Sequence, residues 1–356
     1  MQKLDIPIQI VYPFTIHNYG KTGGFFMNKK RWFALLVAVV LFILSTGFQL
    51  VTSIANTNFE QLFAFPESKF QEEVIEDGTN GKIVVLNLDG VIQDTTPSTL
   101  LNTTSYNHKK FLEMIEEAGS DPNVDGIILR VNTPGGGVVE SAEIHDKIVQ
   151  IQEENEKPIY VSMGNTAASG GYYISAPADK IVAHPATLTG SIGVIMQGYD
   201  LSGLTDKLGI EFNTIKSGEY KDIMSTFREM TDEERELLQA MIDDMYADFV
   251  QVIVDGRGMS ENQVRDLGDG RVYTGRQAQE NGLVDELGTL EDTIAMMKED
   301  FDLSNAQVVT YNNSVGLEQF LGMSVQSLVG KDEELVNLLQ IVQDSNTPRA
   351  MYLYSN

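Results

Sequence analysis

Short β-branched runs alternate with stretches of helical periodicity along this sequence, and few folds accommodate such an alternation. The runs Lys82–Leu88, Gly126–Val131 and Pro158–Ser162 are each bounded by glycine, proline or polar residues, as strands are. Apolar residues recur at helical spacing in Tyr106–Ala118 and in Val138–Glu154. Because alternating β and α elements build parallel sheets covered by helices, the sequence predicts an α/β domain.

A further helix is predicted after Thr231. The sequence TDEE places Thr231 as the N-cap and Glu234 at the third helical position, which is the pattern of a capping box. From about Glu318 another helical pattern leads into a polar tail that contains proline. We therefore expect a folded domain at residues 81–310 and a C-terminal helical segment with a tail at 311–356.

An uncharged stretch lies upstream of this domain. No charged residue occurs between Arg31 and Glu60, and residues 32–52 are apolar almost throughout. About 20 such residues cross the hydrocarbon of a bilayer, which predicts a transmembrane anchor at 32–52. A cleaved signal peptide is the alternative, with Ser53–Ala55 as a cleavage site of small residues.

Charges around the stretch predict its orientation. Basic residues at positions 29–31 precede it and acidic residues follow it, so the positive-inside rule places residues 1–31 in the cytoplasm. The predicted linker at 53–80 and the folded domain that follows it then lie on the extracellular side of the cell membrane. The sequence from Met27 reads as a natural start, which makes residues 1–26 an expected extension of the gene model.

Composition excludes several classes of function. A net charge of −26 argues against binding to nucleic acid, which requires a basic surface to meet phosphates. The absence of cysteine excludes disulfides, thiolate nucleophiles and cysteine-based metal sites. We predict no metal and no cofactor.

Two glycine-rich turns each follow a predicted strand and open a predicted helix. They are RVNTPGGGVVES, residues 130–141, and GNTAASGGYYIS, residues 164–175. Glycines let backbone N–H groups point freely, so such turns suit an oxyanion hole, although glycines that serve only helix–sheet packing are the structural alternative. Ser169 sits in the second turn, where a serine hydroxyl is either a nucleophile or a plain N-cap.

A serine nucleophile needs a base, and the sequence contains only four histidines, at 17, 108, 145 and 184. None of them sits in a pattern that indicates a Ser-His-Asp triad. A Ser–Lys dyad is the alternative, because desolvation can lower the pKa of a lysine toward neutrality. The spacing of the lysines does not by itself choose one of them.

Five motifs occur in one order over about residues 80–300. After the two glycine-rich turns come TLTGSIGVI at 187–195, KSGEYKD at 216–222 and GRVYTGRQAQENGLVDELG at 270–288. Together they resemble the bacterial signal peptide peptidase SppA family. These are membrane-anchored serine proteases of the Ser–Lys type with a ClpP/crotonase-like fold. The chain resembles the short, single-domain type, because it lacks the duplicated half of the long type.

The resemblance implies a role for individual residues. Ser169 is the implied nucleophile and Lys221 the implied general base, while the hydroxyl of Ser191 helps to hold the lysine. The N–H groups of Gly136 and Gly170 are the implied oxyanion-hole donors. The short type further implies a homo-oligomeric ring or dome in which the lysine comes from the neighbouring chain.

The expected activity is a membrane-anchored serine endopeptidase. Its expected partners are the membrane and peptide substrates, in particular remnant signal peptides. Two alternatives belong to other classes: a crotonase-type acyl-CoA enzyme, which also uses glycine-rich oxyanion holes, and a non-catalytic membrane scaffold. An exported domain disfavours the first, and the presence of Ser169, Lys221 and both turns disfavours the second.

Overall fold

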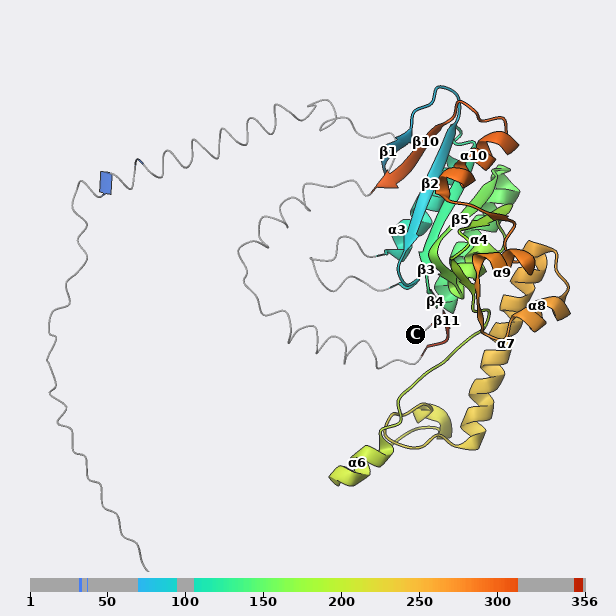
Figure 1. The fold of residues 1–356 in the computed structure, drawn as a ribbon. Coiled ribbons are helices and arrows are strands. Elements are labelled where there is room, and N and C mark those ends of the chain that lie inside the picture. The colour runs from blue at the N-terminus through green and yellow to red at the C-terminus, as the bar shows by residue number, and fades with distance from the viewer. Residues whose placement is uncertain (1–31, 34–36, 38–69, 95–105, 313–348, 355–356) are drawn as a thin grey trace, which may run out of the picture. The chain divides into compact units, whose positions relative to one another are not determined.

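The computed structural model describes residues 32–33, 37, 70–94, 106–312 and 349–354 (Figure 1). The chain divides into two units, Met1–Phe65 and Pro66–Asn356, and every element described below belongs to the second. The predicted anchor at 32–52 and the predicted helical segment after Glu318 lie almost entirely outside the described residues. Within the described ranges, no helix is long and apolar enough to cross a membrane.

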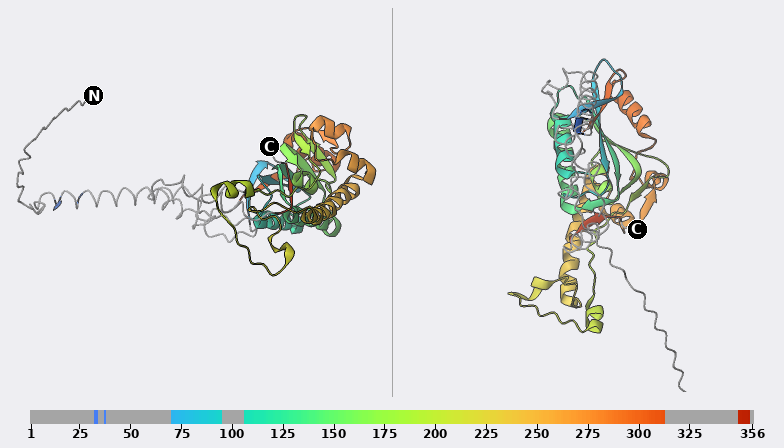
Figure 2. Two further views of the ribbon diagram at one scale, coloured as in Figure 1. Left: turned by 90° about the horizontal axis from the view of Figure 1, so that it is seen from below. Right: turned by 90° about the vertical axis from the view of Figure 1, so that its left-hand side faces the viewer.

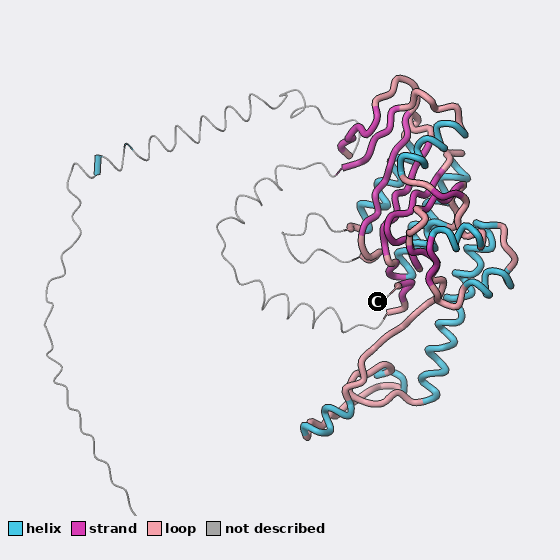
Figure 3. The backbone as a smooth tube through the Cα atoms, in the orientation of Figure 1, coloured by secondary structure: helices cyan, strands magenta, loops and turns pink. Residues whose placement is uncertain are grey.

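A mixed, mostly parallel sheet forms the centre of the second unit (Figures 1 and 3). Its strand order is β1 (Gln71–Glu76), β10 (Gln307–Asn312), β2 (Lys82–Asp89), β3 (Gly126–Thr133), β5 (Ile159–Ala168), β6 (Lys180–Ala183) and β9 (Glu286–Leu287). Only the edge strand β1 runs antiparallel to its neighbour along this order. The sheet confirms the predicted α/β class and the three predicted strands.

A short branch extends the sheet at the end of β5. There β7 (Leu188–Gly190) pairs in parallel with Thr166–Ala168, beyond the residues that pair with β6. On its other side β7 pairs antiparallel with β8 (Val272–Thr274). Two of the motifs, TLTGSIGVI and GRVYTGRQAQENGLVDELG, are thereby brought beside the glycine-rich turn that follows β5.

The helices of the second unit are α3 (His108–Ser120), α4 (Val138–Asn155), α5 (Gly170–Ser175), α6 (Ser202–Leu208), α7 (Asp232–Arg257), α8 (Glu261–Leu267), α9 (Gly275–Glu280) and α10 (Leu290–Asp300). Most of the described helices flank this sheet, and α6 lies apart from it (Figure 1). The three helices expected at 106–118, at 138–154 and after Thr231 are confirmed. The capping box also forms, because Thr231 accepts a hydrogen bond from Glu234 N and the Glu234 carboxylate accepts one from Thr231 N.

Apolar residues fill both faces of the sheet. Successive side chains along a strand point to opposite faces, so Val84 and Leu86 of β2 face the larger core, under α3, α4 and α5. Ile83 and Val85 face the smaller core under α10. Burial of each such side chain contributes about 1.5–3 kcal/mol, which makes the sheet a rigid support for the turns at its carboxyl end.

Residues 196–231, which we call the arm, leave the sheet after the TGSIG motif. The arm contains α6 and a 3₁₀ turn at Glu219–Asp222, and it lies apart from the sheet in Figure 1 and in the right-hand view of Figure 2. The first turns of α7 lie beside the arm, and the chain returns to the body along this helix, whose buried apolar residues Phe249, Val250 and Ile253 lie in its C-terminal half (Figure 1). Many of the large apolar side chains of the arm are exposed, among them Tyr199, Leu204, Leu208, Phe212 and Ile215.

A second, two-stranded sheet joins distant parts of the chain. Strand β11 (Met351–Leu353), from the predicted tail, pairs antiparallel with β4 (Gly135–Gly137), which is the first glycine-rich turn. The sequence analysis did not predict β11. Its position brings the tail to the carboxyl end of the parallel sheet, where the candidate site lies.

Candidate active site

Ser169 occupies the sharp connection between β5 and α5. Its backbone has φ 53° and ψ −116°, a left-handed conformation that a non-glycine residue adopts only under strain. The Ser169 N–H donates to Gly190 O at 2.8 Å, and Ser169 O accepts from Tyr172 N and Tyr173 N, both at 2.9 Å. These bonds fix the strained turn from both sides.

The Ser169 side chain is buried, with 1% of the residue exposed. Ser169 stands at the N-cap position of α5, but its hydroxyl makes no capping hydrogen bond. The plain N-cap interpretation therefore does not describe this serine. Strained residues whose local role is unaccounted for are concentrated at functional sites, which makes Ser169 the centre of the candidate site.

The two glycine-rich turns touch each other beside Ser169. A Cβ placed on Gly170 would lie 3.1 Å from Gly136 N and 2.6 Å from the Ser141 hydroxyl. A Cβ on Gly136 would lie 1.8 Å from Ile92 O, so that position admits no side chain at all. The predicted oxyanion donors at 136 and 170 are thus brought together, next to the serine.

Ser191 also lies at this end of the sheet. It directly follows Gly190, whose carbonyl accepts the Ser169 N–H, and its own N–H donates to Arg271 O at 2.8 Å. Ser191 is nearly buried and has a positive φ of 50°. Four of the five predicted site residues therefore converge on one small region.

Lys221 is the predicted site residue that the structure does not bring to Ser169. It lies in the 3₁₀ turn Glu219–Asp222 of the arm, where its side chain is exposed. Among the described residues it makes no ion pair. The adjacent Asp222 carboxylate instead binds Arg228 and Lys216, and their hydrogen bonds hold its pKa far below the usual range. The acid beside Lys221 is thus neutralised by other cations.

The three described histidines have local partners. His108 is buried between the Tyr106 hydroxyl, at 2.7 Å, and the Glu143 carboxylate, at 2.6 Å. His145 bonds to Asp146, and the Nδ1 of His184 accepts from Ala186 N. In the described ranges no hydrogen bond joins a histidine to Ser169, and His17 lies outside these ranges.

Strand β11 lies along the glycine-rich turn as a peptide would lie in a groove. Tyr352 stands opposite Gly136 in the register with β4, and Tyr354 N donates to Pro134 O at 2.8 Å. On its other side Met351 exchanges two hydrogen bonds with Ile195, at 2.9 and 3.0 Å. Pairing of a segment on both edges in this way is the geometry by which strand addition holds a peptide.

The carbonyl of Tyr352 points toward the candidate oxyanion donors. Its oxygen lies 3.2 Å from the position that a Cβ on Gly170 would take, and 2.0 Å from the corresponding position on Gly135. The missing side chains of the two turns are thus what allow a peptide carbonyl to approach. This close approach gives the glycine clusters a role beyond helix–sheet packing.

An aromatic pocket receives the Tyr352 side chain. The ring stacks on Tyr173 at 4.9 Å between centroids and contacts Phe249 at 4.7 Å, while its hydroxyl donates to Met245 O at 3.1 Å. Burial raises the pKa of Tyr173 to about 12. Sequence reasoning did not identify this pocket, although Tyr173 belongs to the second turn motif and Phe249 to the apolar stripe of α7.

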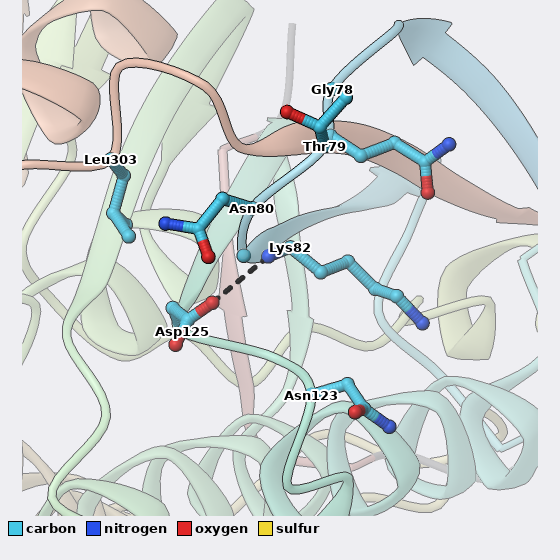
Figure 4. Close-up of a pocket in the computed structure, with 9 residues that line it drawn as sticks. Gly78, Thr79, Asn80, Lys82, Asn123, Asp125 and Leu303 are labelled. Carbon is cyan, nitrogen blue, oxygen red and sulfur yellow. Dashed lines mark hydrogen bonds between the residues drawn. The ribbon is translucent and has the colours of Figure 1, made fainter.

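A cavity of about 430 Å³ lies elsewhere in the domain. It is lined in part by Asn80, Lys82, Asn123, Asp125 and Leu303, and Lys82 N donates to the Asp125 carboxylate at 2.9 Å across it (Figure 4). Lys82 begins β2 and Asp125 precedes β3, so this cavity lies at the amino ends of the strands. The Ser169 turn follows the carboxyl end of β5, so the cavity and the candidate site lie at opposite ends of the parallel strands. No cluster of potential metal ligands is present among the residues described.

Comparison with known proteins agrees with this geometry. Residues 151–304 match the model of peptidase family S49. A protein of Enterococcus faecium named "Putative signal peptide peptidase SppA" is 40% identical over 343 residues, which are 92% of this chain and 99% of that protein. The chloroplastic serine protease SPPA of Arabidopsis thaliana is 32% identical over 236 residues, 65% of this chain and 35% of that protein. A protease-like protein of Synechocystis sp. is 42% identical over 214 residues, 60% of this chain and 72% of that protein.

Proposed function

The chain belongs to peptidase family S49, the family of the serine protease signal peptide peptidase SppA, and from this membership we propose that Ser169 and Lys221 form its catalytic dyad. The observation that carries the proposal is the strained, buried Ser169, which lies against two glycine turns where a peptide strand is already paired. We assign the domain to the ClpP/crotonase-like fold.

In the proposed reaction, the hydroxyl of Ser169 attacks the carbonyl carbon of the scissile bond while neutral Lys221 accepts the proton. The oxygen becomes an anion, and the N–H groups of Gly136 and Gly170 stabilise it. Collapse of this intermediate breaks the C–N bond, and the lysine returns the proton to the departing amine. Water, deprotonated by the same lysine, then hydrolyses the acyl-enzyme.

Lys221 is supplied, in this proposal, by a neighbouring copy of the chain. Its exposed place on the arm and the exposed apolar side chains around it support assembly, because apolar surfaces of this extent mark contacts between proteins. A homo-oligomeric ring or dome would bring the arm of one subunit to the Ser169 turn of the next. There the Ser191 hydroxyl would orient the lysine.

The proposed substrates are peptides that bind as extended strands, in particular remnant signal peptides and other membrane-associated peptides. The aromatic pocket at Tyr173 and Phe249 favours a large apolar residue immediately before the scissile bond. With residues 32–52 as a single transmembrane anchor, the catalytic domain would work on the extracellular face of the cell membrane. Pairing of a strand along β4 favours a peptide over an acyl-CoA thioester.

Labelling by a fluorophosphonate probe tests the nucleophile. The full-length protein in detergent should react covalently at one serine, and tryptic mass spectrometry should find the adduct on the peptide that contains Ser169. The Ser169→Ala variant should lose the label. Labelling that persists in this variant would show that another serine is the nucleophile.

A further inference from the structure

The segment that pairs with β4 also places the cationic side chain of Arg349 beside Glu140. If Tyr352 stands immediately before the scissile bond, Arg349 is the fourth residue before it. The Arg349 guanidinium lies 3.4 Å from the Glu140 carboxylate and donates to the Gln93 side-chain oxygen at 3.1 Å. From this geometry we propose that Glu140 and Gln93 form a subsite that selects substrates with a basic residue four positions before the cleaved bond. The inference rests on the proposed peptidase function.

Contacts with the folded domain hold the Glu140 carboxylate beside strand β4. One oxygen accepts a hydrogen bond from Asp94 N at 3.1 Å. The other lies only 1.8 Å from the position that a Cβ on Gly137 would take, so the carboxylate covers the last residue of β4. Any strand that pairs with β4 therefore passes this charge at a fixed point in its register.

No other cation neutralises Glu140 within the part of the chain that the structure describes. The Glu140 side chain is 13% exposed, whereas that of Arg349 is 40% exposed. Glu140 is therefore part of the folded domain, and the arginine comes with the strand that pairs with β4. The surroundings are negative as well. Burial raises the pKa of the Tyr106 phenol, and the charges of Glu140 and Asp94 raise it further. Without a cationic side chain opposite it, Glu140 would stay an unpaired, largely buried carboxylate, which costs free energy.

Glu140 also has a structural interpretation. It lies in the first turn of α4, where an acidic side chain stabilises the helix by its interaction with the positive end of the helix dipole. A purely structural role would change how much active enzyme is present. It would not change the ratio of the rates at which one preparation cleaves two substrates. The ratio is therefore the quantity to measure.

The test uses the full-length protein in detergent and three fluorogenic peptides based on residues 346–356 of this chain. The first peptide keeps the arginine that matches Arg349, and the other two carry Arg349→Gln or Arg349→Glu. The wild-type enzyme should cleave the arginine peptide about fivefold better in kcat/KM than the glutamine peptide. This factor corresponds to about 1 kcal/mol for one partly exposed ion pair. The glutamate peptide should be cleaved most slowly, and added salt should reduce both differences.

Two variants and one control complete the design. Glu140→Gln should bring the ratio of arginine to glutamine peptide close to one, and Glu140→Lys should make the glutamate peptide the best substrate. Glu153→Gln removes the same charge from an exposed position on α4 and should keep the wild-type ratios. The tail of the enzyme competes equally with all three peptides, so its occupancy cancels in each ratio.

The outcomes are distinguishable. Cleavage of all three peptides with ratios unchanged in Glu140→Lys would overturn the proposed subsite and leave the peptidase function standing. Equal kcat/KM values of the wild-type enzyme for the three peptides would also overturn the subsite and leave the peptidase function standing. If none of the peptides were cleaved and Ser169→Ala behaved like the wild type, the proposed function would fail and this inference with it. Inversion of the preference by Glu140→Lys would establish the subsite.

Discussion

Ser169 is held in a backbone conformation that costs free energy, and its hydroxyl makes no helix-capping bond in return. Such strain costs about 1–3 kcal/mol. Glycine adopts a positive φ without that cost, whereas alanine does not. We therefore expect Ser169→Gly to be more stable than Ser169→Ala by about 1 kcal/mol. Both variants should lose at least about three orders of magnitude in kcat for peptide hydrolysis.

Denaturant unfolding of both variants and a fluorogenic peptide assay would check this pair. The wild-type protein is the reference for both measurements. Equal stabilities of the glycine and alanine variants would mean that the turn is not strained. Substantial activity in either variant would remove Ser169 from the chemistry.

Lys221 can accept the proton of Ser169 only when it is neutral. Arginine stays protonated at any accessible pH, so Lys221→Arg should be as inactive as Lys221→Ala although it keeps the charge. In the wild-type enzyme, kcat/KM should rise with pH along a single ionisation, because deprotonation creates the base. A pH–rate profile and the two variants measure this.

The histidines provide the control for Lys221. His184→Ala removes a side chain that bonds only to nearby Ala186 and should keep substantial activity. His145→Ala removes a hydrogen bond to Asp146 and an edge contact with the Tyr173 ring, 5.4 Å between centroids, but no hydrogen bond with Ser169, and should also keep substantial activity. His108→Ala should also stay active, but less stable, because it breaks a buried contact with Glu143. An active Lys221→Arg together with a dead histidine variant would favour a triad instead of the dyad.

At the scale of elements, strand β11 occupies the edge of β4 along which, in the proposed function, a peptide substrate binds. A tethered segment has an effective concentration in the range of about 1 mM, so it excludes weak substrates efficiently. Removal of residues 349–356 should therefore raise kcat/KM for peptides several-fold. The same deletion removes Tyr352 from its pocket, which should cost about 1.5–3 kcal/mol of stability.

Activity and stability should thus change in opposite directions in this truncated protein. Peptide hydrolysis and thermal unfolding of the same preparation would measure both. A milder variant, Arg349→Glu, places two like charges at the Glu140 contact and should have the same effects to a smaller degree. Unchanged activity in both variants would mean that the tail does not occupy the groove in solution.

Elements that depend on local signals could be predicted from the sequence. The capping box at Thr231 and Glu234 follows from residues three positions apart, and the strands and helices around the glycine turns follow from periodicity. Strand β11 could not be predicted in this way. Its pairing joins Met351 to Ile195 and Tyr352 to Gly136, and no local pattern specifies contacts between residues so distant in the chain.

At the scale of the whole molecule, the structure of one chain brings together four of the five site residues that the sequence motifs predict. Ser169, Gly170, Gly136 and Ser191 meet because β3, β5 and β7 are neighbours in one sheet. Lys221 belongs to the arm, which no strand pairing ties to that sheet. Spacing along the sequence does not tell whether a residue completes the active site of its own chain or that of a neighbouring copy. In the proposed oligomer, a neighbouring copy therefore supplies the base.

Mixing of two inactive proteins tests that assembly. Ser169→Ala keeps a functional lysine and Lys221→Ala keeps a functional serine, so each homo-oligomer should be inactive. In a closed ring of randomly mixed subunits, about a quarter of the sites combine an intact serine with an intact lysine from the neighbour. Coexpression of the two tagged variants and tandem purification should therefore restore about a quarter of wild-type activity. If serine and lysine came from the same chain, no mixed site would contain both, and the copurified oligomer would stay as inactive as its parents.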